Sequence, residues 1–232
     1  MGAALLILRL LERRAGFDPA TGLALPTPLR TALAAAAAVF AAAEVIRHRS
    51  RSGDTPAFEE AFAAPGGEVL LPVMGAMAMA AGGALLVLES LSPVLFLAGV
   101  MAGAVSLLGG GGLLVLVKQL RRDEEPLLLA ALPAMFSSVF VVLAIYLPCA
   151  TDPVLERYWL GVVASAMAAF AFAQLTGFFR KESKPRRFLT VADIAIVLCI
   201  ACLGESIAPG LRVILGGSAA VLAGFTLMAK ED

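Results

Sequence analysis

Two long apolar runs separated by one short turn occupy the middle of the chain. Residues 69–88 form the first run, residues 89–93 form the turn, and residues 94–117 form the second run. Both runs reach the roughly 20 apolar residues that a helix needs to cross a bilayer. Because hydrocarbon offers the backbone no water to bond, a spanning segment of this kind must be helical. We therefore predict a transmembrane helical hairpin at the centre of the fold.

The remainder of the chain has the same character. Hydrophobic residues make up 60% of the sequence and charged residues 16%, far from a typical soluble composition. The runs lack the short alternating pattern of outer-membrane barrel strands. We predict an all-α fold, a polytopic transmembrane helical bundle in which residues 1–232 form a single integral membrane domain. The seven predicted spans are residues 31–46, 69–88, 94–117, 127–147, 157–179, 191–203 and 210–228.

A short hydrophobic helix precedes these spans. Residues 1–11 are apolar apart from Arg9, and Glu12-Arg13-Arg14 follows. About 12 helical residues cover only some 18 Å, which is too short for an upright crossing. Three interpretations stay open: the helix is half-inserted, it lies in the interface, or the true start lies upstream. A short helix that tilts or thins the bilayer would make eight crossings.

Residues 17–23 read Phe-Asp-Pro-Ala-Thr-Gly-Leu and link the short helix to a span that ends in arginines. This arrangement resembles a group of uncharacterised predicted membrane proteins from Gram-positive bacteria. The resemblance brings no known activity with it, so it assigns no functional residue.

Lysine and arginine gather in alternate connections. The richest segments are residues 47–51, 118–122 and 180–187. By the positive-inside rule these segments and the C-terminus are predicted to be cytoplasmic, in the plasma membrane of a bacterium. The arginines that this orientation leaves on the outer side are Arg9, Arg13, Arg14 and Arg30. Equal numbers of acidic and basic residues leave no surplus charge for binding nucleic acid.

Ionisable groups inside the membrane are the usual functional candidates, and this chain has few. Asp193 is the deepest acid, but Thr190-Val-Ala-Asp193 matches a capping box, so we interpret Asp193 as a helix cap. Gln174 is the one carboxamide inside a span, at a depth that would let it meet Asp193. His48 lies among arginines and is predicted to be a solvated residue at the membrane border.

Several serines are predicted near the midplane, among them Ser106 and Ser137. Such serines usually pack or bond to backbone carbonyls, although Ser106 and Ser137 are also possible solute contacts together with Gln174 and Asp193. Within the polar connection that follows residue 51, Phe58 and Phe62 lie four residues apart, which predicts a short helix on the membrane surface. No catalytic, cofactor-binding or metal-binding motif is present, so we expect no enzyme and no cofactor.

Four consecutive glycines, Gly109, Gly110, Gly111 and Gly112, interrupt the second arm of the hairpin. They either admit neighbouring backbones to a continuous helix or mark a broken helix that lines a cavity. Continuity is favoured because no polar cluster lies nearby in the sequence.

Two functions follow from these features. The first is a non-enzymatic membrane component that sits in the lipid bilayer and packs with itself or with partner membrane subunits. The alternative is a small permease for a neutral or weakly polar solute, with Gly109–Gly112 lining the path.

Overall fold

The computed structural model describes residues 1–18, 25, 28–50, 56–62, 69–90, 96–122, 126–149 and 158–229. These residues form helices and two short 3-10 turns, and the one β-type contact among them is an isolated bridge between Phe62 and Ala229. The all-α prediction is confirmed for the described part of the chain. The helices are α1 (Gly2–Ala15), α2 (Pro28–Arg47), α3 (Phe58–Ala61), α4 (Leu70–Glu89), α5 (Phe96–Arg121), α6 (Leu128–Cys149), α7 (Trp159–Gly177), α8 (Pro185–Cys202) and α9 (Pro209–Met228).

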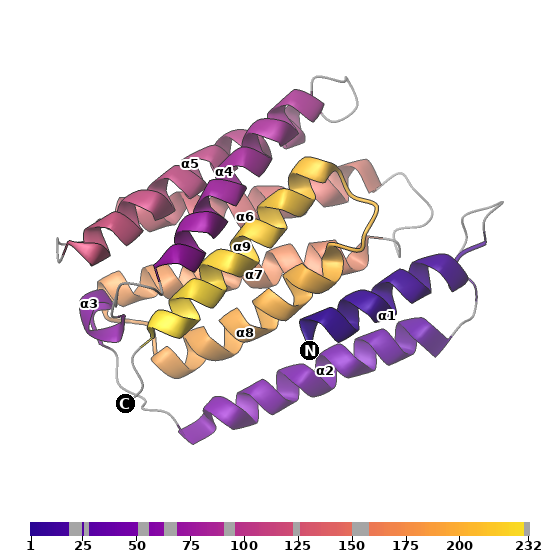
Figure 1. Ribbon diagram of the computed structural model, residues 1–232, viewed down its shortest axis with the longest axis horizontal. Coiled ribbons are helices and arrows are strands. Elements are labelled where there is room, and N and C mark those ends of the chain that lie inside the picture. Colours follow the sequence, from indigo (N-terminus) through magenta and orange to yellow (C-terminus); the bar gives the residue numbers. More distant parts are fainter. Residues whose placement is uncertain are drawn as a thin grey trace.

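Helices α4 to α9 form a closed ring. Each packs against the next one in the sequence, and α9 returns to pack against α4. The pair α1 and α2 lies outside this ring against α8, as Figure 1 shows along the lower edge of the molecule. Helix α8 is consequently covered by α7 and α9 from within the ring and by α1 and α2 from outside.

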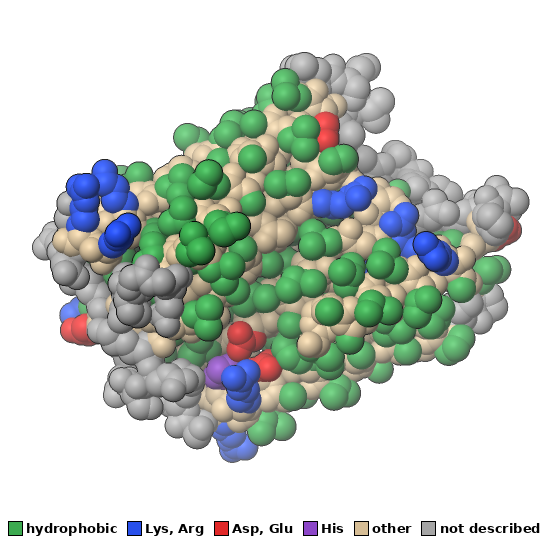
Figure 2. All heavy atoms as spheres, viewed as in Figure 1, with side chains coloured by type: hydrophobic (Ala, Val, Ile, Leu, Met, Phe, Trp, Pro, Cys, Tyr) green, Lys and Arg blue, Asp and Glu red, His purple; other side chains and the backbone are tan. Residues whose placement is uncertain are grey.

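Six of the described helices are long and apolar enough to cross a membrane: α2, α4, α5, α6, α7 and α9. The chain is therefore a multi-pass membrane protein, and apolar side chains cover most of the face in Figure 2. The predicted span 191–203 is not among the six. It belongs to α8, which also carries Arg186, Arg187 and Asp193, and protein buries 10 of the 18 residues of this helix. The prediction of seven spans is thus not fully matched.

Helix α5 is continuous through its four glycines. The backbone of α4 at Ala76 and Ala80 approaches Gly110, and α6 approaches Gly109 and Gly112. Gly111 has no such neighbour within 4 Å. The continuous-helix prediction is confirmed, and the broken-helix alternative is wrong. The turn predicted before this helix falls partly on residues 91–95, which lie outside the described residues.

Glycines also close the ring between α4 and α9. A Cβ atom on Gly75 would lie 2.6 Å from the carbonyl oxygen of Gly217, and one on Gly217 would lie 2.7 Å from that of Gly75. The Glu89 carboxylate, at the end of α4, accepts a hydrogen bond from the Gly210 N–H at 3.1 Å and thereby caps α9. Small residues and a cap thus bring the first and last helices of the ring together.

The short helix predicted from Phe58 and Phe62 is present as α3, but these two side chains face protein. Phe58 and Phe62 are each 2% exposed, and they pack against aromatic rings at the ends of α7, α8 and α9. Ring centroids lie 4.6 Å apart for Phe58 and Phe179, and 5.5 Å apart for Phe62 and Phe188. Helix α3 is a single turn that packs against one end of the bundle, where these rings bury its aromatic side chains.

We expect Gly110→Leu and Gly112→Leu to lower the melting temperature of the protein in detergent, because each new side chain meets the backbone of a neighbouring helix. Overpacking typically costs about 1 to 3 kcal/mol. Gly111→Leu is the matched control and should melt close to the wild type. Equal damage at all three positions would contradict the packing seen here.

Candidate functional site

Helix α1 presents one buried stripe to α8. Its buried residues are Gly2, Leu5, Arg9 and Glu12, spaced by three or four positions so that they share a face. Arg9 is completely buried, which requires that its charge be paired. The partners come from α1 itself and from the connection between α8 and α9.

Arg9, Glu12 and Glu205 form the first polar group, here named the Arg9 cluster. Arg9 Nη1 lies 2.5 Å from Glu12 Oε2, and Arg9 Nη2 lies 2.8 Å from Glu205 Oε1. The second oxygen of Glu205 accepts a hydrogen bond from the Gly161 N–H, at 2.9 Å, in the first turn of α7. One carboxylate therefore caps α7 and pairs with α1 at the same time.

Burial raises the pKa of Glu205 to about 7. The positive charge of Arg9 and the N–H groups at the start of α7 act in the opposite direction, because both stabilise the ionised carboxylate. The desolvation effect is the larger one. Glu205 lies in the connection between α8 and α9, outside the helices that are long and apolar enough to cross the membrane.

Three of the four arginines that the predicted orientation leaves on the outer side form ion pairs or hydrogen bonds within the protein. Besides Arg9, Arg13 donates to the Gly204 carbonyl oxygen at 2.5 Å, and Arg30 Nε lies 3.7 Å from Glu12 Oε1. These contacts leave the conflict with the predicted orientation in place, because the positive-inside rule counts lysine and arginine and not net charge.

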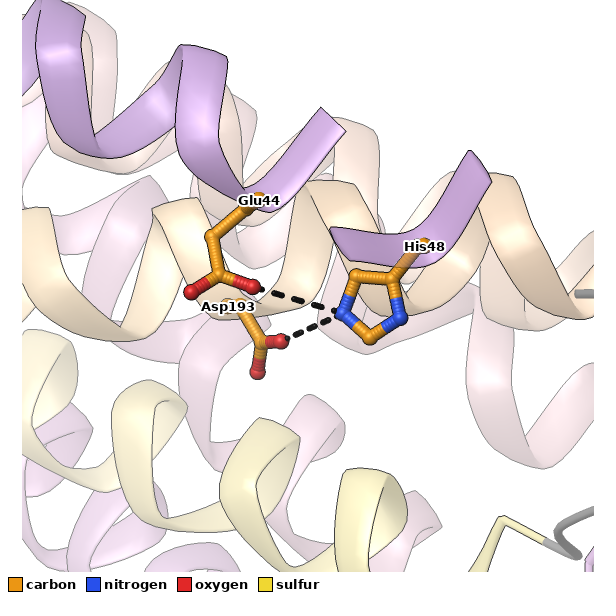
Figure 3. A group of neighbouring side chains, drawn as sticks. All are labelled: Glu44, His48 and Asp193. Atoms are coloured by element: carbon orange, nitrogen blue, oxygen red, sulfur yellow. Dashed lines mark hydrogen bonds and ion pairs between the residues drawn. The ribbon is translucent and has the colours of Figure 1, made fainter. Parts of the chain in front are cut away.

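Glu44, His48 and Asp193 form the second polar group, here named the His48 cluster (Figure 3). Glu44 and His48 lie one turn apart on α2 and the adjoining 3-10 turn, and Asp193 faces them from α8. His48 is 3% exposed. Its Nε2 donates to Asp193 Oδ2 at 2.9 Å and lies 3.4 Å from Glu44 Oε2. The cluster ties the C-terminal end of α2 to α8.

The same three side chains are also the described group with the composition of a metal site, because their ligand atoms all lie within 4.8 Å of one another. An imidazole with two carboxylates suits a divalent transition metal. However, His48 Nδ1 is buried without a hydrogen-bond partner, whereas a ligating histidine usually donates its other N–H to an acceptor. The geometry fits a hydrogen-bonded clamp better than a metal centre.

These contacts correct three sequence-based interpretations. Asp193 is not a cap, because α8 already begins at Pro185, and Thr190 Oγ1 donates to the Arg186 carbonyl within the helix. His48 is buried instead of solvated. Asp193 bonds His48 and not Gln174, which lines a cavity between α2, α7 and α8.

The hydroxyl groups of Ser106 and Ser137 form a hydrogen bond with each other. Their hydroxyl oxygens lie 2.6 Å apart between α5 and α6, and Ser106 also bonds to the Ala102 carbonyl. Both side chains are fully buried. This arrangement is that of a packing contact, and it leaves neither hydroxyl directed at a solute path.

Comparisons with known proteins give no family for the chain. No family model matches it, and neither a curated protein nor a solved structure shows significant similarity. The functional argument therefore depends on the geometry alone.

We expect the melting temperature to fall as the pH rises from about 5 to about 8. The pKa of Glu205 is higher in the folded protein, about 7, than the ordinary value of 4.5, so the folded state binds this proton more tightly. The stability that the proton contributes is complete below pH 4.5 and is lost as the pH passes 7. Glu205→Gln should flatten this dependence. An unchanged slope in that variant would show that another group controls it.

A double-mutant cycle tests the His48 cluster. His48→Phe and Asp193→Leu should show a coupling energy of about 0.5 to 3 kcal/mol, because each removes the partner of the other. Gln174→Leu with Asp193→Leu is the control and should be additive. Unfolding in detergent followed by circular dichroism gives both values. Coupling to Gln174 instead of His48 would contradict the arrangement in Figure 3.

Proposed function

We propose that this protein is a non-enzymatic component of a bacterial plasma membrane that assembles with itself or with a partner membrane subunit through α2. The supporting observation is the exposure of α2. Only 11% of its apolar window is buried, against 39% or more for each of the other five candidate spans. A transmembrane helix with so little protein around it has a large surface left for another chain.

The exposed surface of α2 has the composition of a helix–helix contact. Ala35, Ala38 and Ala42 are exposed and follow one another at intervals of three and four residues, on the side away from the buried Leu33 and Glu44. Small residues are enriched where membrane helices meet, because they let the two backbones come close. Val39 and Ile46 are exposed on the same side, so the alanines lie within a wider apolar surface.

The permease alternative assigned the solute path to Gly109–Gly112. Helix α5 is continuous at Gly109–Gly112, and three of these glycines contact neighbouring helices. Solute transport by this protein would need a different route, so we retain assembly as the proposed function.

The proposed orientation places the C-terminus in the cytoplasm. Figure 1 places the C-terminal ends of α2, α5, α7 and α9 at the same end of the molecule. The basic residues around these ends include Arg47, Lys118, Arg121, Arg180 and Lys181, all of them exposed. We call this the basic end, and by the positive-inside rule it faces the cytoplasm.

Assembly is tested by photo-crosslinking in intact membranes. A benzophenone amino acid in place of Ala42 should yield an adduct with a second polypeptide, because this position lies on the exposed face of α2. The control is the same amino acid at Ala104, an exposed position on α5. It should yield no polypeptide adduct. The absence of any adduct at Ala42 would contradict the proposal.

Orientation is tested by thiol labelling of intact cells in a Cys149→Ser background. Ser206→Cys lies between α8 and α9, and Glu182→Cys lies at the basic end; both positions are exposed, whereas Cys199 and Cys202 are buried. A membrane-impermeant reagent should label Ser206→Cys at once and Glu182→Cys only after permeabilisation. The reverse pattern would invert the proposed orientation.

A further inference from the structure

A basic cavity opens between three helices at the basic end. It has a volume of about 560 Å³, and its walls come from α2, α7 and α8 together with the turn that precedes α8. Lys184, Arg186 and Arg187 contribute its positive charge. None of these three side chains forms an ion pair with an acidic residue in the described part of the chain. Gln174 and Thr190 add polar groups beside them.

An apolar cavity of about 300 Å³ follows deeper in the molecule. The same three helices line it, with α1 adding Leu5. Along each helix the lining residues continue inward from those of the basic cavity. On α8 they pass from Arg187 to Leu198, on α7 from Gln174 to Trp159, and on α2 from Val45 to Ala34. The two cavities thus follow one another along α2, α7 and α8, and we call the two together the groove.

The groove is at least as long as one leaflet of a bilayer. On α8 its lining residues Arg187 and Leu198 are eleven positions apart, or about 16 Å of helix, and on α7 Gln174 and Trp159 are fifteen positions apart, or about 22 Å. One leaflet contributes about half of the roughly 30 Å hydrocarbon thickness. The charged end of the groove would therefore lie at headgroup level, and its apolar part would lie at the depth of an acyl chain.

We propose that this groove binds one anionic phospholipid from the leaflet at the basic end. The phosphate lies among Lys184, Arg186 and Arg187, and an acyl chain runs along α8 toward Leu198. Charge complementarity favours an anionic headgroup, because the three cations that line the mouth form no ion pair with any described acidic residue. The apolar continuation favours a lipid over a free anion, because a free anion would leave the inner cavity unfilled. This inference goes beyond assembly through α2 and does not depend on it.

The test uses the purified full chain, delipidated in a neutral detergent. Phosphatidylglycerol should raise the melting temperature in a saturable way, since a ligand that binds the folded state stabilises it by mass action. Phosphatidylcholine with the same acyl chains should produce a much smaller shift, and inorganic phosphate should produce none. An equal shift with phosphatidylcholine, or a shift with phosphate alone, would overturn the proposal.

The basic residues are tested by the triple variant Lys184→Gln, Arg186→Gln and Arg187→Gln. It should weaken phosphatidylglycerol binding at least about tenfold, given the attraction that each basic residue exerts on an anionic lipid. The matched control is Lys118→Gln, Arg121→Gln and Lys181→Gln, which removes three exposed charges at the same end outside the groove lining. Unchanged binding in the first variant, or equal loss in both, would overturn the proposal.

The acyl-chain part of the groove is tested by Ala37→Trp, which places a large side chain in the apolar cavity. It should also weaken phosphatidylglycerol binding, while Ala104→Trp on the exposed face of α5 should not. Melting without lipid shows whether each variant folds. If Ala37→Trp fails to fold, the triple variant alone decides the outcome.

Discussion

Lipid exerts no hydrophobic force that would press one apolar helix against another, so every helix of this protein needs close backbone packing or polar contacts to stay in place. The ring of α4 to α9 uses the first solution, with glycines between α4 and α9 and between α5 and its neighbours. The α1–α2 pair uses the second. The Arg9 cluster fastens α1 to the end of α8 and the start of α7, and the His48 cluster fastens α2 to the middle of α8.

The loose attachment of α2 explains both proposed functional features. Polar contacts hold α2 near its two ends, where Arg30 faces Glu12 of α1 and His48 bonds Asp193 of α8, and only Leu33 and Glu44 of this helix are buried. Its outer face is exposed and carries Ala35, Ala38 and Ala42 beside Val39 and Ile46, which leaves room for a partner helix. Its inner side leaves a groove against α7 and α8, which suits a lipid. A helix packed as tightly as α9 would offer neither surface.

The sequence predicted the features that depend on local composition and failed where distant residues meet. Apolar runs located α4, α5, α6, α7 and α9, and the absence of nearby polar residues favoured a continuous α5. The pairing of His48 with Asp193 joins positions 145 residues apart, and no periodicity relates them. The capping pattern at Thr190 was misleading because it depends on four residues only, whereas the helix had already begun at Pro185. Likewise, the burial of Phe58 depends on rings from other helices, which the local spacing cannot reveal.

Hydrogen exchange measured by mass spectrometry tests most directly whether polar clusters hold the α1–α2 pair to the ring. The variant should combine Arg9→Met with His48→Phe, which removes one member of each cluster. We expect faster exchange in peptides from α1 and α2, with peptides from α4, α5 and α6 unchanged, because glycine contacts hold the ring independently. Unchanged exchange in α1 and α2, or an equal increase in every helix, would contradict this account.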